Sequence, residues 1–154
     1  MENQKIEQAK AHALARFADT GPDRINCSQA VLCYALEVMG QDCDLVTLAA
    51  YFGGGIASMG EACGAVTGAV LAAGARDYFT EQQNPETTAA TKAALQKAMK
   101  GFAEKFGSCR CLDLTGYDLS TPEVFAAFKM SEAHDRCQIY VAWMMDEITP
   151  LLEA

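Results

Sequence analysis

Cysteine is the residue type in this chain whose chemistry stands out, because seven cysteines are present in 154 residues. Four of them lie where the sequence predicts the ends of helices. Cys27, Cys63 and Cys137 each precede a helix-like stretch, and Cys111 follows a glycine that is expected to end a helix. Cysteine thiolates exchange with disulfides and bind metal ions. We therefore take these four cysteines as the candidate site.

Cys63 has the most informative surroundings. It lies in GEACGAVTG, residues 60–68, where a glycine-containing loop turns into a predicted helix. A thiol in the first turn of a helix is close to the positive end of the macrodipole and to free backbone N–H groups, and both favour the thiolate. If the chain works by thiol–disulfide exchange, we expect Cys63 to be the attacking thiolate and Cys27 to be its resolving partner.

A metal centre is the other chemistry that the four cysteines allow. Their spacings of 36, 48 and 26 residues match no compact ligand motif, so they can meet only if the fold brings the helix ends together. We expect Cys27, Cys63, Cys111 and Cys137 to converge near one pole of a helical bundle. As metal ligands they would suit an iron–sulfur cluster better than zinc if the role is redox. Cys109 competes with Cys111 for the third position.

The remaining cysteines and the two histidines are less informative. Cys33 lies on an apolar predicted helix, which favours a core residue, and Cys43 lies in a polar loop, where we expect it to be exposed. We interpret His12, on a charged helix, as solvated. His134 lies three residues before Cys137 and adds an imidazole there, although one histidine near one cysteine is weak evidence for a zinc site.

The spacing of apolar residues predicts an all-α fold, because no stretch alternates with a period of two. We expect one domain over residues 1–154, a bundle of about six to seven helices with glycine-rich loops. A face of Gly64, Gly68 and Ala72 is small enough for another helix to approach closely. The predicted helices cover residues 3–18, 26–39, 44–51, 61–75, 86–106, a segment that starts at Pro122, and 136–148, the last stopping or kinking before Pro150.

Composition excludes several classes of partner. The net charge of −8, with only 12 lysines and arginines, argues against nucleic acids and anionic membranes. No run of apolar residues reaches the length of about 18 that spans a bilayer, and residues 1–7 lack the apolar stretch of a secretory signal. We therefore expect a soluble, cytoplasmic protein. In a reducing compartment, its cysteines would not form a structural disulfide framework.

Several sequence blocks, taken together, resemble the C_GCAxxG_C_C family of redox-active proteins. The resemblance implies a helical redox domain with clustered cysteines, and related domains look to be fused to electron-carrying modules. It places the family's four cysteines on Cys27, Cys63, Cys111 and Cys137, and it favours Cys111 over Cys109 because Cys111 keeps the distance to the GYDL block. The blocks are NCSQAVL (26–32), FGGG (52–55), GEACGAVTGA (60–69), FGS (106–108), GYDL (116–119) and Cys137.

One departure from the family pattern is visible. The family name spells Gly-Cys-Ala-x-x-Gly, whereas this chain has Cys63 and Gly64 in the first two positions of the same frame, ending at Gly68. The exchange keeps a cysteine in the block and changes the backbone contacts around it.

Two functional hypotheses follow. The leading one is a redox-active protein, an oxidoreductase or an electron-transfer protein, with an iron–sulfur cluster or another metal ion or with no cofactor, and with an unidentified electron-transfer partner. The competing one is a non-catalytic helical module that binds another protein and keeps its cysteines reduced in the core. The apolar, Met-rich residues 141–145 support the second hypothesis, because they could pack in a homodimer.

Overall fold

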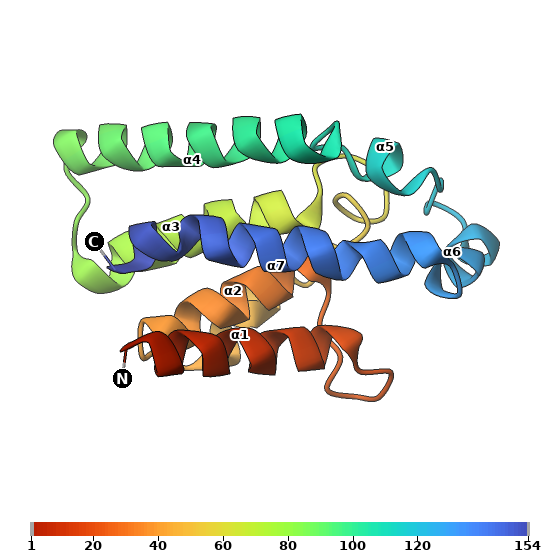
Figure 1. The fold of residues 1–154 in the computed structure, drawn as a ribbon, viewed down its shortest axis with the longest axis horizontal. Helices are drawn as coiled ribbons and strands as arrows, with labels where there is room; N and C mark the ends of the chain where they lie inside the picture. Colours follow the sequence, from red (N-terminus) through yellow and green to blue (C-terminus); the bar gives the residue numbers. More distant parts are fainter. Residues whose placement is uncertain (1, 154) are drawn as a thin grey trace.

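The computed structural model describes residues 2–153, and every regular element in that range is a helix (Figure 1). This confirms the predicted all-α class. The elements are α1 (Glu2–Ala18), α2 (Cys27–Val38), the 3₁₀ helix η1 (Cys43–Ala49), α3 (Gly64–Thr80), α4 (Pro85–Phe106), α5 (Cys111–Thr115), α6 (Pro122–Lys129) and α7 (Glu132–Glu153).

Local signals set the ends of these helices. Asn26 caps α2 in a capping box, in which its Oδ1 accepts the Gln29 N–H at 2.8 Å and its own N–H donates to the Gln29 side chain at 3.0 Å. Pro85 begins α4, where the missing N–H costs nothing. Gly107 ends α4 in the left-handed conformation, with φ of 94°. Of these residues, Asn26 fixes the start of the helix that begins with Cys27, and Gly107 fixes where the loop that contains Cys109 begins.

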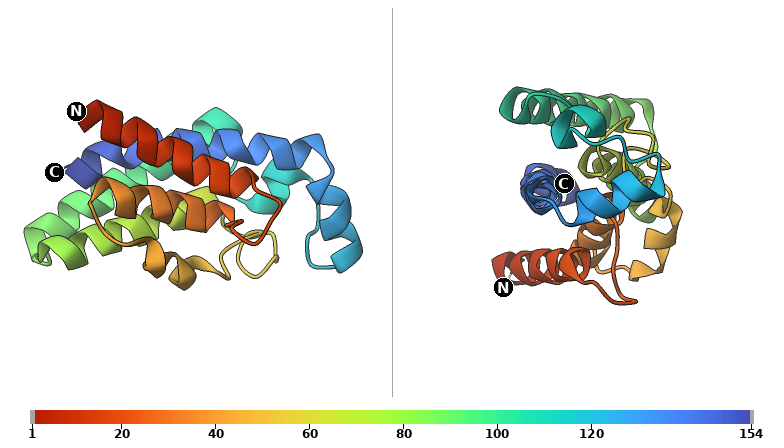
Figure 2. Two further views of the ribbon diagram at one scale, coloured as in Figure 1. Left: turned by 90° about the horizontal axis from the view of Figure 1, so that it is seen from below. Right: turned by 90° about the vertical axis from the view of Figure 1, so that its right-hand side faces the viewer.

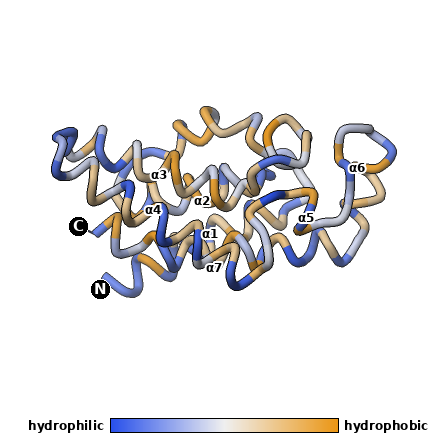
Figure 3. The backbone as a smooth tube through the Cα atoms, turned by 90° about the horizontal axis from the view of Figure 1, so that it is seen from above, coloured by the Kyte–Doolittle hydropathy of each residue, from blue (hydrophilic) through white to orange (hydrophobic). Residues whose placement is uncertain are grey.

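Helix α2 is the centre of the bundle. It contacts α1, α3, α7 and η1, and these elements surround it in the end-on view (Figure 2). Tyr34 on α2 is fully buried, and its hydroxyl pairs with Thr149 of α7 at 2.6 Å. By contrast, the outer helices α1 and α4 change between hydrophobic and hydrophilic residues within each turn, as amphipathic surface helices do (Figure 3).

The predicted small face of α3 packs against α2. A Cβ added at Gly68 would lie 2.7 Å from the Ser28 carbonyl oxygen and 2.8 Å from the Val31 Cβ. Ala72 is fully buried. Since only glycine fits at position 68, the two helix backbones approach closely along this face, as predicted.

Aromatic residues join α4 to α7. The Phe102 ring lies 5.8 Å, between centroids, from both Tyr140 and Trp143. On α7, the side chains of Met144 and Met145 are fully buried. The Met-rich segment therefore packs in the core of this chain, and it no longer supports the hypothesis of an interaction module that dimerises through it.

The predicted bounds of two helices are wrong. Helix α3 runs from Gly64 to Thr80 instead of 61–75, and it ends at Glu81 in the left-handed conformation. Helix α7 begins earlier, at Glu132, and continues through Pro150 to Glu153. Pro150 lies in the last turn, so few helical bonds follow the one that its ring removes. Nearby, Arg76 donates to the Leu151 carbonyl at 3.0 Å, one of the carbonyls that the end of the helix leaves free.

None of the helices formed by residues 2–153 is long and apolar enough to cross a membrane.

Candidate functional site

The four predicted site cysteines line one small cavity of about 20 Å³. Cys27 is the first residue of α2, Cys63 is the N-cap of α3, Cys111 is the first residue of α5, and Cys137 lies in the second turn of α7. The fold therefore brings together four residues from four elements, at the end of the bundle where α5 lies (Figure 1). We call these four residues the cysteine pole.

The position of Cys137 differs from the prediction. It was expected in the first turn of a helix, but α7 begins five residues earlier, at Glu132. Ser131 explains the earlier start, because its hydroxyl accepts the His134 N–H at 3.4 Å and so caps the helix. The sulfur of Cys137 lies 3.5 Å from the Ala133 carbonyl, one turn back. Cys137 is thus held by a continuous helix, not by a helix end.

Two loops that hold Cys63 and Cys111 are hydrogen-bonded to each other. The Cys63 N–H donates to the Cys109 carbonyl at 2.7 Å, and the Cys111 N–H donates to the Glu61 carbonyl at 2.7 Å. The Cys109 side chain is directed elsewhere, since its sulfur lies 3.4 Å from the Met99 carbonyl of α4. Cys111, and not Cys109, therefore lines the cavity.

Glycines make room for the sulfurs. A Cβ added at Gly64 would lie 2.0 Å from the Cys27 sulfur, and one added at Gly55 would lie 2.6 Å from the Cys111 Cβ. Gly55 also has a φ of +76°, which favours glycine. No larger residue fits at position 64 without displacing Cys27. The exchange of cysteine and glycine in this block thus puts the residue without a side chain directly against the sulfur of α2.

The loop before Cys63 is conformationally strained. Ile56, Ala57 and Ser58 have φ values of 67°, 51° and 61°. Left-handed geometry costs a residue with a side chain about 1–2 kcal/mol. Backbone hydrogen bonds hold the loop in this form; for example, the Ala57 N–H donates to the Tyr51 carbonyl at 2.7 Å. Strain of this kind gathers near functional sites, where the surrounding structure enforces it.

A second, larger cavity of about 260 Å³ adjoins the cysteine pole. Cys27, Cys111 and Cys137 line it, whereas Cys63 does not. Its other lining residues include the aromatic side chains of Phe17, Phe125 and Phe128. Cys63 is only 7% exposed. Three sulfurs therefore border the larger cavity, and the fourth lies behind them in the core.

Arg24 and His134 also border the larger cavity. Arg24 Nη2 donates to His134 Nε2 at 3.3 Å, which assigns the ring proton to Nδ1. Burial, and then the charge of Arg24, lower the pKa of His134. The imidazole is consequently neutral at pH 7, and its Nε2 is already occupied as an acceptor.

Burial raises the pKa of every cysteine in the pole. The pKa of Cys63 is well above the ordinary thiol value, first through burial and then through the nearby Cys27. Burial also raises the pKa of Cys111 to about 11 and that of Cys137 to about 12. The expected lowering of the Cys63 pKa by its helix terminus is therefore wrong in direction, because burial outweighs the macrodipole. Without a metal, these thiols are neutral at pH 7.

Cys27 has the most polar surroundings of the four sulfurs. Burial raises the pKa of Cys27, and hydrogen bonds from the backbone N–H groups of Gly54, Ser28 and Gly64 oppose that rise. Backbone donors directed at a sulfur stabilise its negative charge, whether the sulfur is a free thiolate or is bound to a metal. The features that we expected around Cys63 are thus found around Cys27.

The donor types of the pole suit a metal centre. Four cysteine sulfurs are an ordinary ligand set for zinc and for iron–sulfur clusters. The structure also contains a second group of donors: among residues 2–153, His12, Cys33 and Glu37 offer ligand atoms within 4.8 Å of one another.

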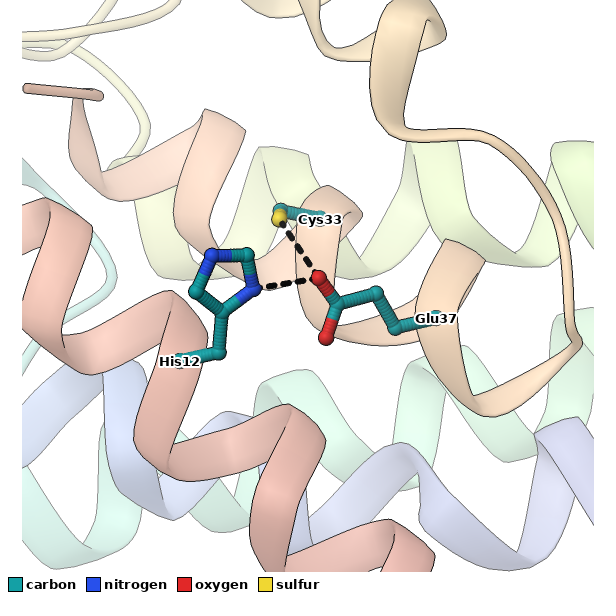
Figure 4. Close-up of side chains that lie close together, drawn as sticks. All are labelled: His12, Cys33 and Glu37. Carbon is teal, nitrogen blue, oxygen red and sulfur yellow. Dashed lines mark hydrogen bonds and ion pairs between the residues drawn. The ribbon is translucent and has the colours of Figure 1, made fainter. Parts of the chain in front are cut away.

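The cluster of His12, Cys33 and Glu37 was missed in the sequence (Figure 4). The Cys43 sulfur also lies there, 3.4 Å from the Cys33 sulfur and 3.5 Å from Glu37 Oε1. The expectation of an exposed Cys43 is therefore wrong, because Cys43 is half-buried at the start of η1. His12 is solvated as expected, and it also contacts Glu37. Cys33 and Glu37 lie one helical turn apart, which is the signal that could have revealed the cluster.

The protein is an all-α bundle with four cysteines gathered at one buried end, and this makes it a cysteine-cluster protein. The chain belongs to the C_GCAxxG_C_C family: residues 25–150 match the family model described as "Putative redox-active protein (C_GCAxxG_C_C)", which confirms the resemblance seen in the sequence. The matched range contains all four cysteines of the pole. Neither the curated proteins nor the solved structures gave a match.

Proposed function

We propose that this protein is an electron carrier whose cysteine pole holds an iron–sulfur cluster. The observation that supports it best is the convergence of Cys27, Cys63, Cys111 and Cys137 on one buried cavity. Four cysteine thiolates are the usual ligand set of such clusters. When bound, the cluster supplies one-electron transfer.

The environment of the sulfurs also favours a cluster. Backbone N–H groups of Gly54, Ser28 and Gly64 point at the Cys27 sulfur. Hydrogen bonds to cluster sulfurs and burial are two of the factors that set the potential of a cluster. Coordination to iron would also remove the thiol protons, despite the raised pKa of each cysteine, because the charge of the metal dominates the site.

The larger cavity suggests where electrons enter and leave. Cys27, Cys111 and Cys137 border it, and aromatic side chains are among its other lining residues. A cluster held by these three sulfurs, with Cys63 behind it, would be shielded from bulk water. We propose that an electron-transfer partner, a separate protein, exchanges electrons at this end of the bundle.

The test is iron and sulfide analysis of protein that has been purified or reconstituted without oxygen, together with absorption and electron paramagnetic resonance spectra. Stoichiometric iron and sulfide with thiolate-to-iron charge-transfer bands are expected. Cys→Ser changes at each of the four positions should remove most of the iron. Cys109→Ser is the matched control, because its sulfur faces Met99 and not the cavity, so this variant should keep its iron. Undiminished iron in Cys137→Ser would contradict the proposed ligand set.

Protein that stays colourless and iron-free after reconstitution would instead favour thiol–disulfide exchange. One observation supports this second candidate and its assignment: Cys27 borders the larger cavity and accepts backbone N–H groups, whereas Cys63 is buried behind it. In that case Cys27 would be the attacking thiolate and Cys63 the resolving thiol, the reverse of the roles expected from the sequence. In a Cys63→Ser protein given a small disulfide such as oxidised glutathione, Cys27 would bond to one sulfur, release the other as a thiolate and remain in the mixed disulfide, which mass spectrometry would locate.

A further inference from the structure

We propose that Cys33, Cys43, Glu37 and His12 form a zinc site that is separate from the cysteine pole. The four side chains come from three elements that follow one another in the chain: His12 from α1, Cys33 and Glu37 from α2, and Cys43 from η1. Figure 4 shows His12 and Cys33 directed toward the same carboxylate oxygen of Glu37. The site would therefore join the first three elements of the fold.

The distances among three of the donor atoms fit one tetrahedral ion. The two sulfurs lie 3.4 Å apart, and Glu37 Oε1 lies 3.5 Å from the Cys43 sulfur and 4.0 Å from the Cys33 sulfur. Zinc bonds of about 2.0–2.3 Å place tetrahedral ligands about 3.3–3.8 Å apart. His12 Nδ1 contacts the same oxygen of Glu37, and a ring nitrogen of His12 lies within 4.8 Å of the Cys33 sulfur. Binding of the ion would replace this direct contact, so His12 and Glu37 must separate to become ligands.

The donor types and the charge also favour zinc. Two thiolates, one imidazole and one carboxylate are all ordinary zinc ligands. Two thiolates and a carboxylate exceed the charge of Zn²⁺ by one negative unit. Arg16 supplies the balancing positive charge, because its Nη1 lies 3.8 Å from the Cys33 sulfur, where it can donate to a metal-bound thiolate.

The buried ligands indicate a structural zinc site, and one exposed ligand leaves a path by which the ion can enter. Cys33 is fully buried, whereas the His12 side chain is 52% exposed. Four protein ligands leave no open position for a substrate, which is typical of structural zinc. Bound zinc would hold α1 and η1 against α2. This role is independent of any cluster at the cysteine pole, because the two sites share no residue.

The test uses the full chain, reduced and treated with a chelator, and then titrated with Co²⁺ and with Zn²⁺ without oxygen. Cobalt reports tetrahedral thiolate ligation by its visible absorption. Spectral changes lost in His12→Gln and Cys43→Ser, but kept in Cys137→Ser and in His134→Gln, are expected for this site. Replacing a residue that only hydrogen-bonds to a metal ligand already lowers metal affinity about 10–100-fold. Loss of a ligand itself should therefore lower the Zn²⁺ affinity by at least about 100-fold.

Two results would overturn the proposal. One is a Co²⁺ spectrum and a Zn²⁺ affinity that are unchanged in both His12→Gln and Cys43→Ser. The other is a Cys33–Cys43 disulfide, seen by mass spectrometry, in protein purified without oxygen. His12 and Cys43 are both partly exposed, so these variants are expected to fold, and circular dichroism checks this. X-ray absorption of the zinc-loaded protein adds a direct readout: two sulfur and two nitrogen or oxygen ligands are expected.

Discussion

Replacing Gly64 with alanine tests whether this glycine exists to make room for a sulfur. The new Cβ would lie 2.0 Å from the Cys27 sulfur and 2.8 Å from the Ser28 backbone nitrogen, so α3 or Cys27 must move. Overpacking of this kind costs about 1–3 kcal/mol. Alanine regains little helix propensity at the first position of α3. We expect a loss of about 2 kcal/mol in the free energy of unfolding, or a drop of about 4–8 °C in Tm.

Two other glycines on α3 provide matched controls. Gly68→Ala would place a Cβ 2.7 Å from the Ser28 carbonyl oxygen but contacts no sulfur, so it should lower stability by a similar amount and leave iron binding intact. Gly74→Ala meets nothing within 4 Å and should raise stability by about 0.5–1 kcal/mol.

The assay combines thermal unfolding with iron content after reconstitution. Gly64→Ala should lose most of its iron at temperatures where it is still folded, and Gly68→Ala should not. If Gly64→Ala keeps full iron and full stability, the contact with the Cys27 sulfur has no energetic consequence, and the reasoning about this glycine fails.

Three further predictions follow from the core and from the buried thiols. Phe102→Ala should lower the free energy of unfolding by about 3–5 kcal/mol in denaturant titrations, because the fully buried ring joins α4 to α7; a loss below 1 kcal/mol would contradict this. Arg76→Met should lower the free energy of unfolding by about 3 kcal/mol in the same measurement, because this buried guanidinium donates to Asp77, Thr91 and Leu151. An Arg76→Met protein as stable as the wild type would show that these hydrogen bonds are dispensable. Reduced, metal-free protein should keep its full thiol-linked stability below the ordinary thiol pKa of 9.0. It should lose stability as pH rises toward about 11 and 12, the raised pKa values of Cys111 and Cys137, because the unfolded chain ionises first. Between pH 8 and pH 10, urea titrations should show a loss of about 1.4 kcal/mol per thiol in total, because the full slope of about 1.4 kcal/mol per pH unit applies only above pH 9.0. A flat profile would refute this, and Cys137→Ser should reduce the loss.

Much of the fold could be predicted from local patterns. The capping residue Asn26, the prolines that begin α4 and α6, and Gly107 at the end of α4 act within a few residues of themselves, so the sequence reveals them directly. Helix α7 was predicted less well, because a proline usually ends a helix, whereas here the helix continues to Glu153 and the distant residue Arg76 donates to the Leu151 carbonyl beyond the proline. The sequence does not show that partner.

The sequence predicted which residues form the candidate site but not the chemical state of each one. The four cysteines could be identified because they lie in loops and at expected helix ends. The state of each sulfur, however, depends on burial by elements that are far apart in the chain. Cys63 was expected to be the activated thiol, yet its neighbours bury it, whereas Cys27 receives the backbone donors. The second cluster was missed because His12 and Cys43 reach Glu37 from separate elements.

The two loops that are hydrogen-bonded to each other connect two of the four cysteines of the pole. Cys27 and Cys137 lie within α2 and α7, whereas Cys63 and Cys111 lie where loops enter α3 and α5, and the bonds to Cys109 and Glu61 join these loops. Because of the two bonds, a displacement of one loop is passed to the other. A group bound at the pole would hold both loops, so hydrogen exchange should slow at the amides of Cys63 and Cys111. Binding at the pole would then change the rigidity of these loops, and a partner that binds at this end would contact loops that are more rigid when the pole is occupied.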